Sequence, residues 1–421
     1  MKYSLLRGMQ DIFPETIHLW QYVEDCAKKT VESFNFKEIR TPIVENAELF
    51  LRSIGEDTDI VEKEMYIFQD KKGRKVALRP EGTASVVRAY IQHSLFNNPA
   101  PQKFYYIGPM FRYERPQKGR FRQFHQIGVE SFGIASPVID AELIYMLKMF
   151  LESLDIKNLN YEINSLGCEK CRPEYRKVLF NFLADKVTNL CNDCQRRFEK
   201  NPLRVLDCKL PACKESLKNI PLILDFLCND CKNHFLSLQN ELDEMKISYA
   251  INPRIVRGLD YYTRTVFEVT TTMLGAQNAI AAGGRYDTLV ALFGGPSTPA
   301  AGFAIGMERL IEICANSLSI KPEKNLVYVA YITGQVEEKE ARKLVRFLRN
   351  KEISVETSYE EASLKSQLRK ADRLGADIVI IVGEDEIKKS LYKWKNMKNG
   401  LQGEASLDEL VDLIRKSNVN N

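Results

Sequence analysis

The sequence predicts an α+β protein in which a strand-rich domain carries a helical insertion and is followed by a small α/β domain. Three observations predict it. Residues 104–130 have the aromatic and branched side chains of two strands joined by a charged loop. Residues from about 168 to 246 show helical patterns and no strand pattern. After about residue 325, strand and helix patterns alternate, as in a small α/β domain.

Length and composition set the broad class. At 421 residues the chain exceeds one ordinary core, so two or three domains are expected. The absence of an apolar run long enough for a signal peptide or a bilayer span predicts a cytoplasmic protein without a membrane partner. The net charge is only +4, so any nucleic-acid surface must be a local patch. Ten cysteines in such a protein indicate metal ligands or buried thiols rather than disulfides.

The first hundred residues predict a helix over 15–33 and then a strand-like run, KEIRTPIVE. Pro42 interrupts this run, which fits a strand end or an edge strand. A strand ending near residue 78 then turns through RPEGT into a helix. Glu81 and Thr83 lie in this turn, a common place for ligand contacts. The ordinary alternative is a helix start that Thr83 caps.

The loop of the predicted hairpin concentrates positive charge. It contains a single carboxylate, Glu114, among five cations: Arg112, Arg115, Lys118, Arg120 and Arg122. Because a guanidinium group binds phosphate oxygens in a bidentate fork, the loop predicts a phosphate site. In the second strand Gln126 and Glu130 are four residues apart and therefore point to one face. A solvated hairpin with scattered charge is the alternative, and it accounts less well for so dense a loop.

The rest of the first domain alternates strands and helices. A helix is expected over 138–154, a strand over 159–167 and, after the insertion, an alternating strand over 263–272. The run IAAGGRYD at 280–287 contains two glycines, which permit close approach of the backbone to a ligand or a strand. AGFAIGMERL at 301–310 reads as a strand entering a helix, and a linker follows near residue 320.

Several of these stretches resemble the motifs of histidyl-tRNA synthetases, a family of class II aminoacyl-tRNA synthetases. KEIRTP resembles motif 1, FRYERPQKGRFRQF motif 2 and AGFAIGMERL motif 3, which together indicate the class. RGLDYYTRTVFEV and AAGGRYD resemble the two stretches particular to histidine. The resemblance implies a catalytic domain over 1–320 with an antiparallel sheet flanked by helices, an insertion over 168–246 and an anticodon-binding domain over 325–421. It also implies a homodimer with motif 1 at the interface.

The resemblance implies a role for each matching residue. Glu81 and Thr83 would fix the α-amino group of L-histidine. Arg112 would bind the α-phosphate and the substrate carboxylate, Arg257 would lie opposite it, and Arg309 would bind the γ-phosphate of ATP. The histidine pocket would be lined by Gln126, Glu130, Tyr261, Tyr262 and Tyr286.

The resemblance also implies Mg²⁺, ATP and tRNA(His) as partners. Arg115 and Gln117 would touch the extra guanosine at the acceptor end of this tRNA. In the C-terminal domain Lys365, Arg369 and Arg373 share one helical face. Lysines that surround Trp394 combine cations with an aromatic ring, which suits single-stranded RNA. A lysine face is usually only solvated, and the resemblance favours anticodon binding here.

Eight of the ten cysteines form close pairs in the insertion: Cys168/Cys171, Cys191/Cys194, Cys208/Cys213 and Cys228/Cys231. Such spacings are typical of structural zinc sites, and eight thiols suffice for one or two Cys₄ sites. A structural Zn²⁺ would stabilise an insertion with a thin core. Reduced cysteines buried as small apolar side chains are the alternative. Spacing alone does not choose which four belong together, and Cys26 and Cys314 are expected in the core.

The predicted function is that of a histidine–tRNA ligase. It would activate L-histidine with ATP to histidyl-adenylate and pyrophosphate, and then transfer histidine to the 3′ end of tRNA(His). Arg112 and Arg257 with Mg²⁺ would stabilise charge on the α-phosphate, and no general base is needed because the attacking carboxylate is ionised. One rival is a non-aminoacylating regulatory paralogue of ATP phosphoribosyltransferase, which lacks the anticodon domain and has a degraded RGLDYY stretch. The other is a sensor of uncharged tRNA, which would not require all three arginines.

Overall fold

The structure of the chain, a computed structural model, describes residues 3–55, 58, 60–99, 101–116, 119–208, 210–256, 258–274, 279–318 and 326–419. The chain divides into two compact units, Met1–Ser319 and Ile320–Asn421. Each unit has its own sheet and its own core, and each is described by itself below.

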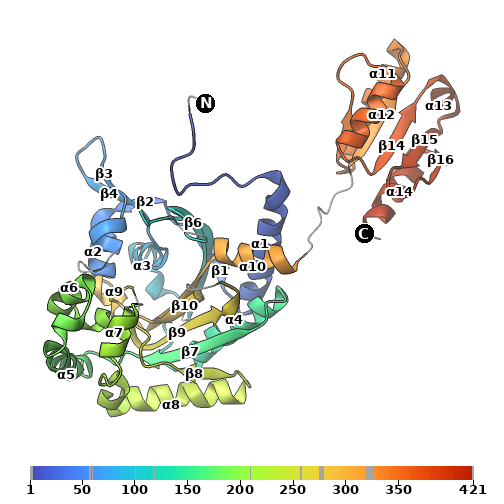
Figure 1. Ribbon diagram of the computed structural model, residues 1–421. Helices are drawn as coiled ribbons and strands as arrows, with labels where there is room; N and C mark the ends of the chain where they lie inside the picture. The colour runs from blue at the N-terminus through green and yellow to red at the C-terminus, as the bar shows by residue number, and fades with distance from the viewer. Residues whose placement is uncertain are drawn as a thin grey trace. The chain divides into compact units, whose positions relative to one another are not determined.

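An eight-stranded sheet forms the centre of the first unit, with strand order β1-β5-β6-β11-β10-β9-β7-β8 (Figure 1). Neighbouring strands are antiparallel except at the two edges, where β1 pairs with β5 and β7 with β8 in parallel. The predicted α+β class with an antiparallel sheet is thereby confirmed. The strands are β1 (Lys37–Glu38), β5 (Gln102–Phe111), β6 (Gln123–Phe132), β7 (Leu159–Ser165), β8 (Tyr249–Ile251), β9 (Thr263–Thr271), β10 (Ala279–Arg285) and β11 (Ala300–Gly306).

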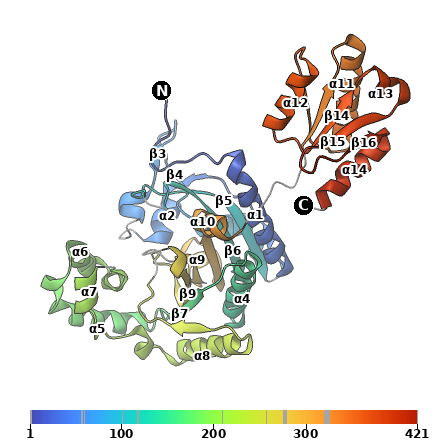
Figure 2. The ribbon, with the colours of Figure 1, turned by 45° about the vertical axis from the view of Figure 1, so that its right-hand side comes forward.

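Four helices pack against one face of this sheet. They are α1 (Pro14–Ser33), α4 (Val138–Ser153), α8 (Asn229–Glu244) and α10 (Met307–Ser317). Helix α1 begins at a proline, whose fixed φ suits the first helical position, and buries Leu19, Val23 and Ala27 along one stripe. Helix α8 packs against β7 and β9, and both views show it beside β7 (Figures 1 and 2).

The opposite face carries α3 (Thr83–Gln92) and a small three-stranded sheet of order β2-β4-β3. Its strands are β2 (Val44–Asn46), β3 (Ile67–Gln69) and β4 (Lys75–Leu78), and α2 (Ala47–Ile54) and α9 (Leu289–Leu292) lie beside α3. The run KEIRTPIVE divides at Pro42, so β1 joins the large sheet and β2 the small one, each as an edge strand. Three short helical turns, η1 (Ile60–Glu64), η2 (Leu95–Asn97) and η6 (Thr272–Leu274), complete this part.

The insertion between β7 and β8 is helical, and no strand occurs among its described residues. It contains α5 (Arg172–Ala184), η3 (Val187–Asn189), α6 (Asn192–Lys200), η4 (Pro202–Asp207), α7 (Pro211–Ser216), η5 (Ile223–Phe226) and α8. Its small core combines Tyr175, Leu179 and Val205 with buried cysteines.

The second unit is a five-stranded sheet of order β13-β12-β14-β15-β16. Strand β12 is parallel to both β13 and β14, and β15 and β16 are added antiparallel. The elements are β12 (Val327–Tyr331), α11 (Gln335–Asn350), β13 (Val355–Thr357), α12 (Leu364–Arg373), β14 (Ile378–Val382), α13 (Glu384–Lys389), β15 (Tyr392–Asn396), β16 (Gln402–Ala405) and α14 (Leu407–Val419).

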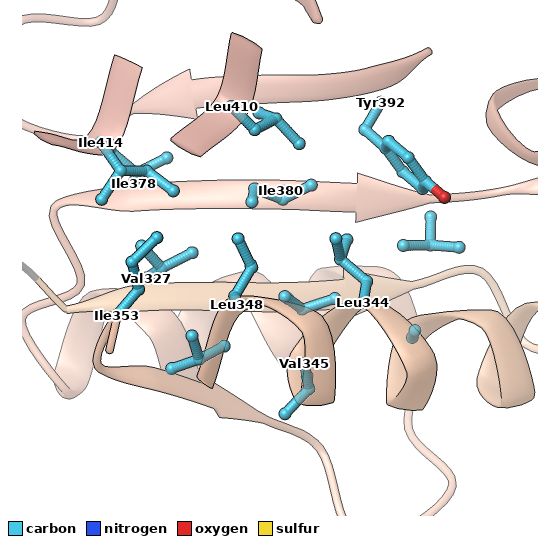
Figure 3. Packing of buried hydrophobic residues seen from close by; sticks show 14 of the residues in the cluster. Val327, Leu344, Val345, Leu348, Ile353, Ile378, Ile380, Tyr392, Leu410 and Ile414 are labelled. Atoms are coloured by element: carbon cyan, nitrogen blue, oxygen red, sulfur yellow. The ribbon is translucent and has the colours of Figure 1, made fainter. Parts of the chain in front are cut away.

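Apolar side chains of α11, α14 and the sheet form the core of this unit, as Figure 3 shows for Leu348, Ile380 and Leu410. The sequence did not predict α13 or β16, because EDEIKK is short and QGEA has no alternating apolar pattern. In the described part of the chain, none of the helices combines the length and apolar character needed to cross a membrane.

Candidate active site

A cavity of about 270 Å³ opens on the face of the large sheet that α3 covers. Strands β5, β6, β10 and β11 contribute to its floor, and the starts of α3 and α10 and the turn before β9 close its sides. Eight of the predicted site residues line it: Glu81, Thr83, Arg112, Gln126, Tyr261, Tyr262, Tyr286 and Arg309. The fold therefore brings together residues that are more than two hundred positions apart in the sequence.

Glu81 caps helix α3. Its carboxylate accepts hydrogen bonds from the backbone N–H of Thr83 at 2.7 Å and of Ala84 at 2.8 Å. Burial raises the pKa of Glu81 above its usual value. The alternative in which Thr83 caps the helix is wrong, because Gly82 holds the N-cap position. The Thr83 hydroxyl instead donates to Oε1 of Glu130 at 2.6 Å.

Glu130 lies directly behind the cavity wall rather than among the residues that line it, and only 1% of it is exposed. It accepts hydrogen bonds from the hydroxyls of Thr83, Tyr106 and Tyr286, which come from three different elements. Burial raises the pKa of Glu130 to about 8. The carboxyl group thus serves as the shared acceptor beneath the polar end of the cavity.

Three tyrosine rings build one wall of this end. The ring centroid of Tyr261 lies 4.8 Å from that of Tyr262 and 5.7 Å from that of Tyr286. Burial raises the pKa of Tyr261 and Tyr286 well above the usual value, so these hydroxyls stay neutral and available for hydrogen bonding. Oε1 of Gln126, which is also buried, has no hydrogen-bond partner among the described residues. A buried acceptor of this kind is costly unless a ligand supplies the donor.

The other end of the cavity is cationic. Arg112 donates from Nε to the carbonyl of Pro80 at 2.8 Å, and Nη1 of Arg309 donates to the carbonyl of Ala279 at 2.5 Å. Arg120 also lines the cavity and pairs with Glu114 at 3.0 Å. Burial lowers the pKa of Arg309, and the nearby Arg120 guanidinium acts in the same direction. Three guanidinium groups, those of Arg112, Arg120 and Arg309, line this end of the cavity and favour an anionic ligand such as a polyphosphate.

Not every predicted cation belongs to the cavity. The guanidinium of Arg122 stacks on the Tyr113 ring at 3.5 Å from the ring centroid and is not among the groups that line the cavity. Arg115 is exposed and is not among the cavity-lining residues. Arg257 and Gln117 lie outside the described residues, so their roles stay predictions.

Sequence reasoning missed Tyr106, which lines the cavity and donates to Glu130. Its ring lies between two glycines, since a Cβ added at Gly82 or at Gly128 would come within 2.2 Å of it. A glycine inside an apolar strand signals such a close approach, so Gly128 could have indicated the neighbouring ring. Glu308 was also missed: it accepts from the backbone N–H of His125 at 2.9 Å and ties α10 to β6.

The eight paired cysteines separate into two groups of four, within each of which all sulfur atoms lie within 4.8 Å of one another. The proximal cluster consists of Cys168, Cys171, Cys228 and Cys231, and the distal cluster of Cys191, Cys194, Cys208 and Cys213. The structure thereby supplies the grouping that spacing left open. Cys26 and Cys314 belong to neither cluster.

In the second unit Lys365, Arg369 and Arg373 are exposed on one face of α12. Trp394 packs against the core of this unit, on the strand face opposite the exposed Lys393 and Lys395. The sequence pattern indicated an aromatic ring among cations, but this ring lies on the other face of the strand from Lys393 and Lys395. Several lysines there are ion-paired: Lys388 with Glu384, Lys393 with Glu386 and Lys398 with Asp377.

An antiparallel sheet whose motif 2 hairpin and motif 3 arginine meet in one cavity, together with a C-terminal α/β unit, defines a class II aminoacyl-tRNA synthetase. Comparisons with known proteins agree and narrow the class. The family model described as histidyl-tRNA synthetase matches residues 8–310, and one described as anticodon binding domain matches residues 326–417. The chain belongs to the histidyl-tRNA synthetase family.

Curated relatives named histidine–tRNA ligase support this at full length. The protein of Thermodesulfovibrio yellowstonii is 81% identical over 416 residues, which is 99% of each chain. That of Desulfatibacillum aliphaticivorans is 50% identical and covers 98% of each. Among solved structures, apo histidyl-tRNA synthetase of S. aureus is 37% identical with a TM-score of 0.82, covering 98% of this chain and 100% of that one.

A further solved structure bears on the regulatory alternative. It is titled as an ATP phosphoribosyltransferase regulatory subunit/histidyl-tRNA synthetase from Bacillus halodurans C, is 21% identical with a TM-score of 0.64 and covers 91% of this chain and 99% of that one. At this identity the likeness shows the fold alone. The ligase function is favoured over the regulatory one by the far more similar relatives and by the matched anticodon binding domain.

Proposed function

We propose that this histidine–tRNA ligase makes histidyl-adenylate from L-histidine and ATP in the 270 Å³ cavity and then esterifies the 3′ end of tRNA(His). The observation that carries the proposal is the polarity of the cavity. Arginines converge at one end, while neutral tyrosines and a buried carboxyl group lie at the other. The neutral ring of an amino acid fits the polar end, and the phosphates of a nucleoside triphosphate fit the cationic end. The carboxylate of the amino acid and the α-phosphate would then meet between the two ends.

At the polar end, the imidazole of histidine offers one N–H donor and one nitrogen acceptor. Glu130 is proposed to accept from the imidazole through the hydroxyls that bond to it, and the Tyr262 hydroxyl is the proposed donor. The unpartnered oxygen of Gln126 supplies a further acceptor for the ligand. Paired hydrogen bonding of this kind rejects amino acids without the matching groups by about 10⁴–10⁵.

At the start of α3, Glu81 and Thr83 are proposed to bind the α-amino group of the substrate. The carboxylate of Glu81 is buried and accepts hydrogen bonds from the first turn of the helix, so its orientation is fixed before substrate arrives. A rigid acceptor at this place would hold the ammonium group and direct the substrate carboxylate toward the arginines.

At the cationic end, Arg112 is proposed to bind the α-phosphate and Arg309 the γ-phosphate, with Arg257 opposite Arg112 as the resemblance implies. Attack of the histidine carboxylate on the α-phosphorus forms a C–O–P bond and releases pyrophosphate. Negative charge develops on phosphoryl oxygens and on the leaving group, and fixed guanidinium groups stabilise it without proton transfer. In the second step, the terminal ribose hydroxyl of tRNA attacks the histidyl carbonyl and releases AMP.

Mg²⁺ in such sites is usually held by one or two carboxylates together with substrate phosphates. Glu114 fits this requirement, since it lines the cavity beside Arg120 and near Arg309. When bound, the ion would neutralise phosphate charge. We include a structural divalent metal in the cysteine-rich insertion in this proposal.

For tRNA, we propose that Arg115 and Gln117 in the motif 2 loop contact the acceptor end, and that the α12 face with Lys365, Arg369 and Arg373 contributes to anticodon binding. The cations of α12 are exposed, whereas the lysines near Trp394 are largely paired. The α12 face is therefore the better candidate for phosphate contacts.

We further propose a cytoplasmic homodimer with the motif 1 region at the interface. Exposed apolar side chains gather beside that region, including Ile43, Val44 and Phe68. Contact with a second copy of the chain would remove the apolar surface of these side chains from water. Sedimentation of the full chain should give twice the 48.4 kDa mass, and a monomer at micromolar concentration would contradict the dimer.

The overall proposal is tested by charging a tRNA(His) transcript with labelled histidine. We expect ATP-dependent formation of a base-labile ester that blocks periodate oxidation of the tRNA 3′ end. Arg257→Ala is expected to remove this activity. Protein that folds and binds tRNA(His) but forms no ester would overturn the ligase assignment and favour the sensor.

A further inference from the structure

The proximal and distal cysteine clusters take no part in the chemistry proposed above. Each cluster joins two segments of the insertion that are well separated in sequence, at 168–171 and 228–231 or at 191–194 and 208–213. Most of the eight thiols are buried, three of them belong to the apolar core of the insertion, and Cys191 packs against that core. Four sulfur atoms that lie this close together form a possible ligand set for one metal ion.

The sulfur separations match a tetrahedral thiolate site. Tetrahedral zinc with Zn–S bonds of about 2.3 Å places its sulfur atoms about 3.8 Å apart. The distance from Sγ of Cys168 is 3.7 Å to Cys171 and 3.8 Å to Cys228, and Sγ of Cys191 lies 4.0 Å from Cys208. Disulfide bonding needs a separation near 2.05 Å, and it would pair sulfur atoms in twos rather than fours.

Backbone N–H groups support thiolates in both clusters in the same way. The N–H of Cys228 donates to Sγ of Cys171 at 3.2 Å, and the N–H of Cys191 donates to Sγ of Cys213 at 3.2 Å. In each case the donor belongs to the cysteine that precedes a helix, α8 or α6. Such donors stabilise a charged sulfur and orient it, as is usual around metal ligands.

The proximal cluster is connected to the cavity by one side chain. Arg172 directly follows Cys171, donates from Nε to the carbonyl of Leu166 at 3.2 Å, and donates from Nη2 to the carbonyl of Tyr262. The loop between Leu166 and Cys171 is compact, because a Cβ on Gly167, whose φ is +63°, would come within 2.6 Å of the Cβ of Cys171. The position of Cys171 therefore determines where Arg172 holds the backbone of Tyr262.

The distal cluster reaches the same stretch less directly. Arg204, which lies between Cys194 and Cys208 in the sequence, pairs with Asp260 at 2.9 Å. The Asp260 side chain is 38% exposed, so solvent weakens this contact. The two clusters thus differ in how strongly they are coupled to the tyrosine wall.

We propose that the insertion binds two zinc ions, one in each cluster of four thiolates, and that the proximal ion positions Tyr262 through Arg172. This rests on the proposed function only in assigning Tyr262 to the histidine pocket. The proximal cysteines and Arg172 are positioning residues, since none of them contacts substrate.

The first test is the zinc content of the full chain purified without chelator, measured by elemental mass spectrometry. We expect two zinc ions per chain, one in the Cys228→Ser/Cys231→Ser variant and one in the Cys208→Ser/Cys213→Ser variant. Cys26→Ser, outside both clusters, should keep two. Zinc below one half per chain in the wild type, or iron in its place, would overturn the proposal.

The second test separates positioning from a merely structural role through histidine-dependent ATP–pyrophosphate exchange. The proximal double variant should raise the KM for histidine by about tenfold or more and leave the KM for ATP within about twofold, as for residues that orient a site indirectly. The distal variant should change the KM for histidine by less than about threefold. Equal effects of the two variants would contradict selective coupling.

The Arg172→Met variant tests the positioning role even if the double variants fail to fold, because it leaves all eight cysteines in place. It should retain both zinc ions and still raise the KM for histidine selectively. Unchanged kinetics in this variant would overturn the positioning role. Absence of exchange in zinc-loaded wild-type protein would instead reject the proposed ligase chemistry and leave the metal sites standing.

Discussion

At the scale of single residues, Glu130 shows how a buried carboxyl group organises the polar end of the cavity. The sequence predicted that Gln126 and Glu130 share one strand face, because strand side chains alternate. It did not predict that the hydroxyls of Thr83, Tyr106 and Tyr286 converge on Glu130, since that arrangement depends on how α3, β5 and β10 pack. The sequence therefore predicted which residues belong to the site, but not which of them contact one another.

Glu130→Gln should weaken histidine binding. The variant keeps the size of the side chain but replaces one of the two oxygens that accept from the hydroxyls of Thr83, Tyr106 and Tyr286 by an NH2 group, which can only donate. Leaving a buried hydrogen-bond donor without its acceptor costs about 1–3 kcal/mol, which corresponds to a KM for histidine about 5 to 150 times higher. Exchange kinetics over a range of histidine concentrations measure this. A KM within twofold of the wild type would refute the role of Glu130.

The same substitution should alter the pH dependence of stability. The pKa of Glu130 is raised from 4.5 to about 8 by burial, so its contribution is fully present below pH 4.5 and is lost as pH rises through about 8. Glu130→Gln lacks this loss and should gain stability relative to the wild type by up to about 1.4 kcal/mol per pH unit between these values. Calorimetric melting at several pH values measures the difference, and a pH-independent difference would be inconsistent with the raised pKa.

Gly302 is required by close packing. A Cβ at this position would lie 2.2 Å from the carbonyl oxygen of Val129 and 2.3 Å from Oε2 of Glu130. Gly302→Ala should therefore displace β11 or Glu130, lower stability by about 1–3 kcal/mol and raise the KM for histidine. Gly306→Ala, where a Cβ meets nothing within 4 Å, is the matched control for stability. Equal melting temperatures for the two variants would contradict this account.

At the scale of elements, Arg285 joins β10 to α4 and, through a shared partner, to α8. The fully buried Arg285 pairs with Asp140 at 2.7 Å and with Asp287 at 2.9 Å, while His234 on α8 contacts Asp140 at 2.8 Å. This arginine belongs to the stretch AAGGRYD, which resembles one particular to histidine, but it does not line the cavity and instead joins secondary-structure elements.

Arg285→Met should therefore destabilise the first unit by about 3–5 kcal/mol, because two carboxylates lose a buried partner. Arg74→Met is a suitable control, since Arg74 and Asp70 form an exposed pair at 2.6 Å and such pairs contribute at most about 1 kcal/mol. Thermal melting of both variants measures the difference in stability. Similar melting temperatures would show that the buried network contributes little.

Strong patterns made most elements predictable. The hairpin of β5 and β6 follows from aromatic and branched residues on both sides of a charged loop, and α1 follows from its regular apolar stripe. Helix α2 and strand β16 escaped prediction, because a single short amphipathic helix and an exposed strand have weak signals. Their formation depends on neighbouring elements that the sequence does not place.

At the scale of the whole molecule, the two units differ in which part of the predicted function their residues carry. All described residues that line the cavity belong to the first unit. The motifs therefore predicted the chemistry from that unit, whereas the second unit matches the family model described as anticodon binding domain. Arg257 and Gln117, which lie outside the described residues, rest on the family resemblance and not on geometry.

A chain that ends at residue 318 should keep histidine-dependent exchange within about fivefold of the full chain. Its KM for tRNA(His) should rise by at least about tenfold, because each lost group of phosphate contacts reduces affinity. Exchange and charging assays on the same preparation measure both. Loss of exchange in a folded fragment would show that the second unit contributes to adenylate formation.

The measurement that tests the central claim most directly is histidine-dependent ATP–pyrophosphate exchange, with Arg112→Ala and Arg309→Ala beside the wild type. We predict exchange that requires histidine and falls by at least about a hundredfold in each variant, because each removes a fixed charge from the cationic end of the cavity. Exchange that is absent from folded, magnesium-supplied wild-type protein, or that is unaffected in both variants, would contradict the claim that this cavity forms histidyl-adenylate.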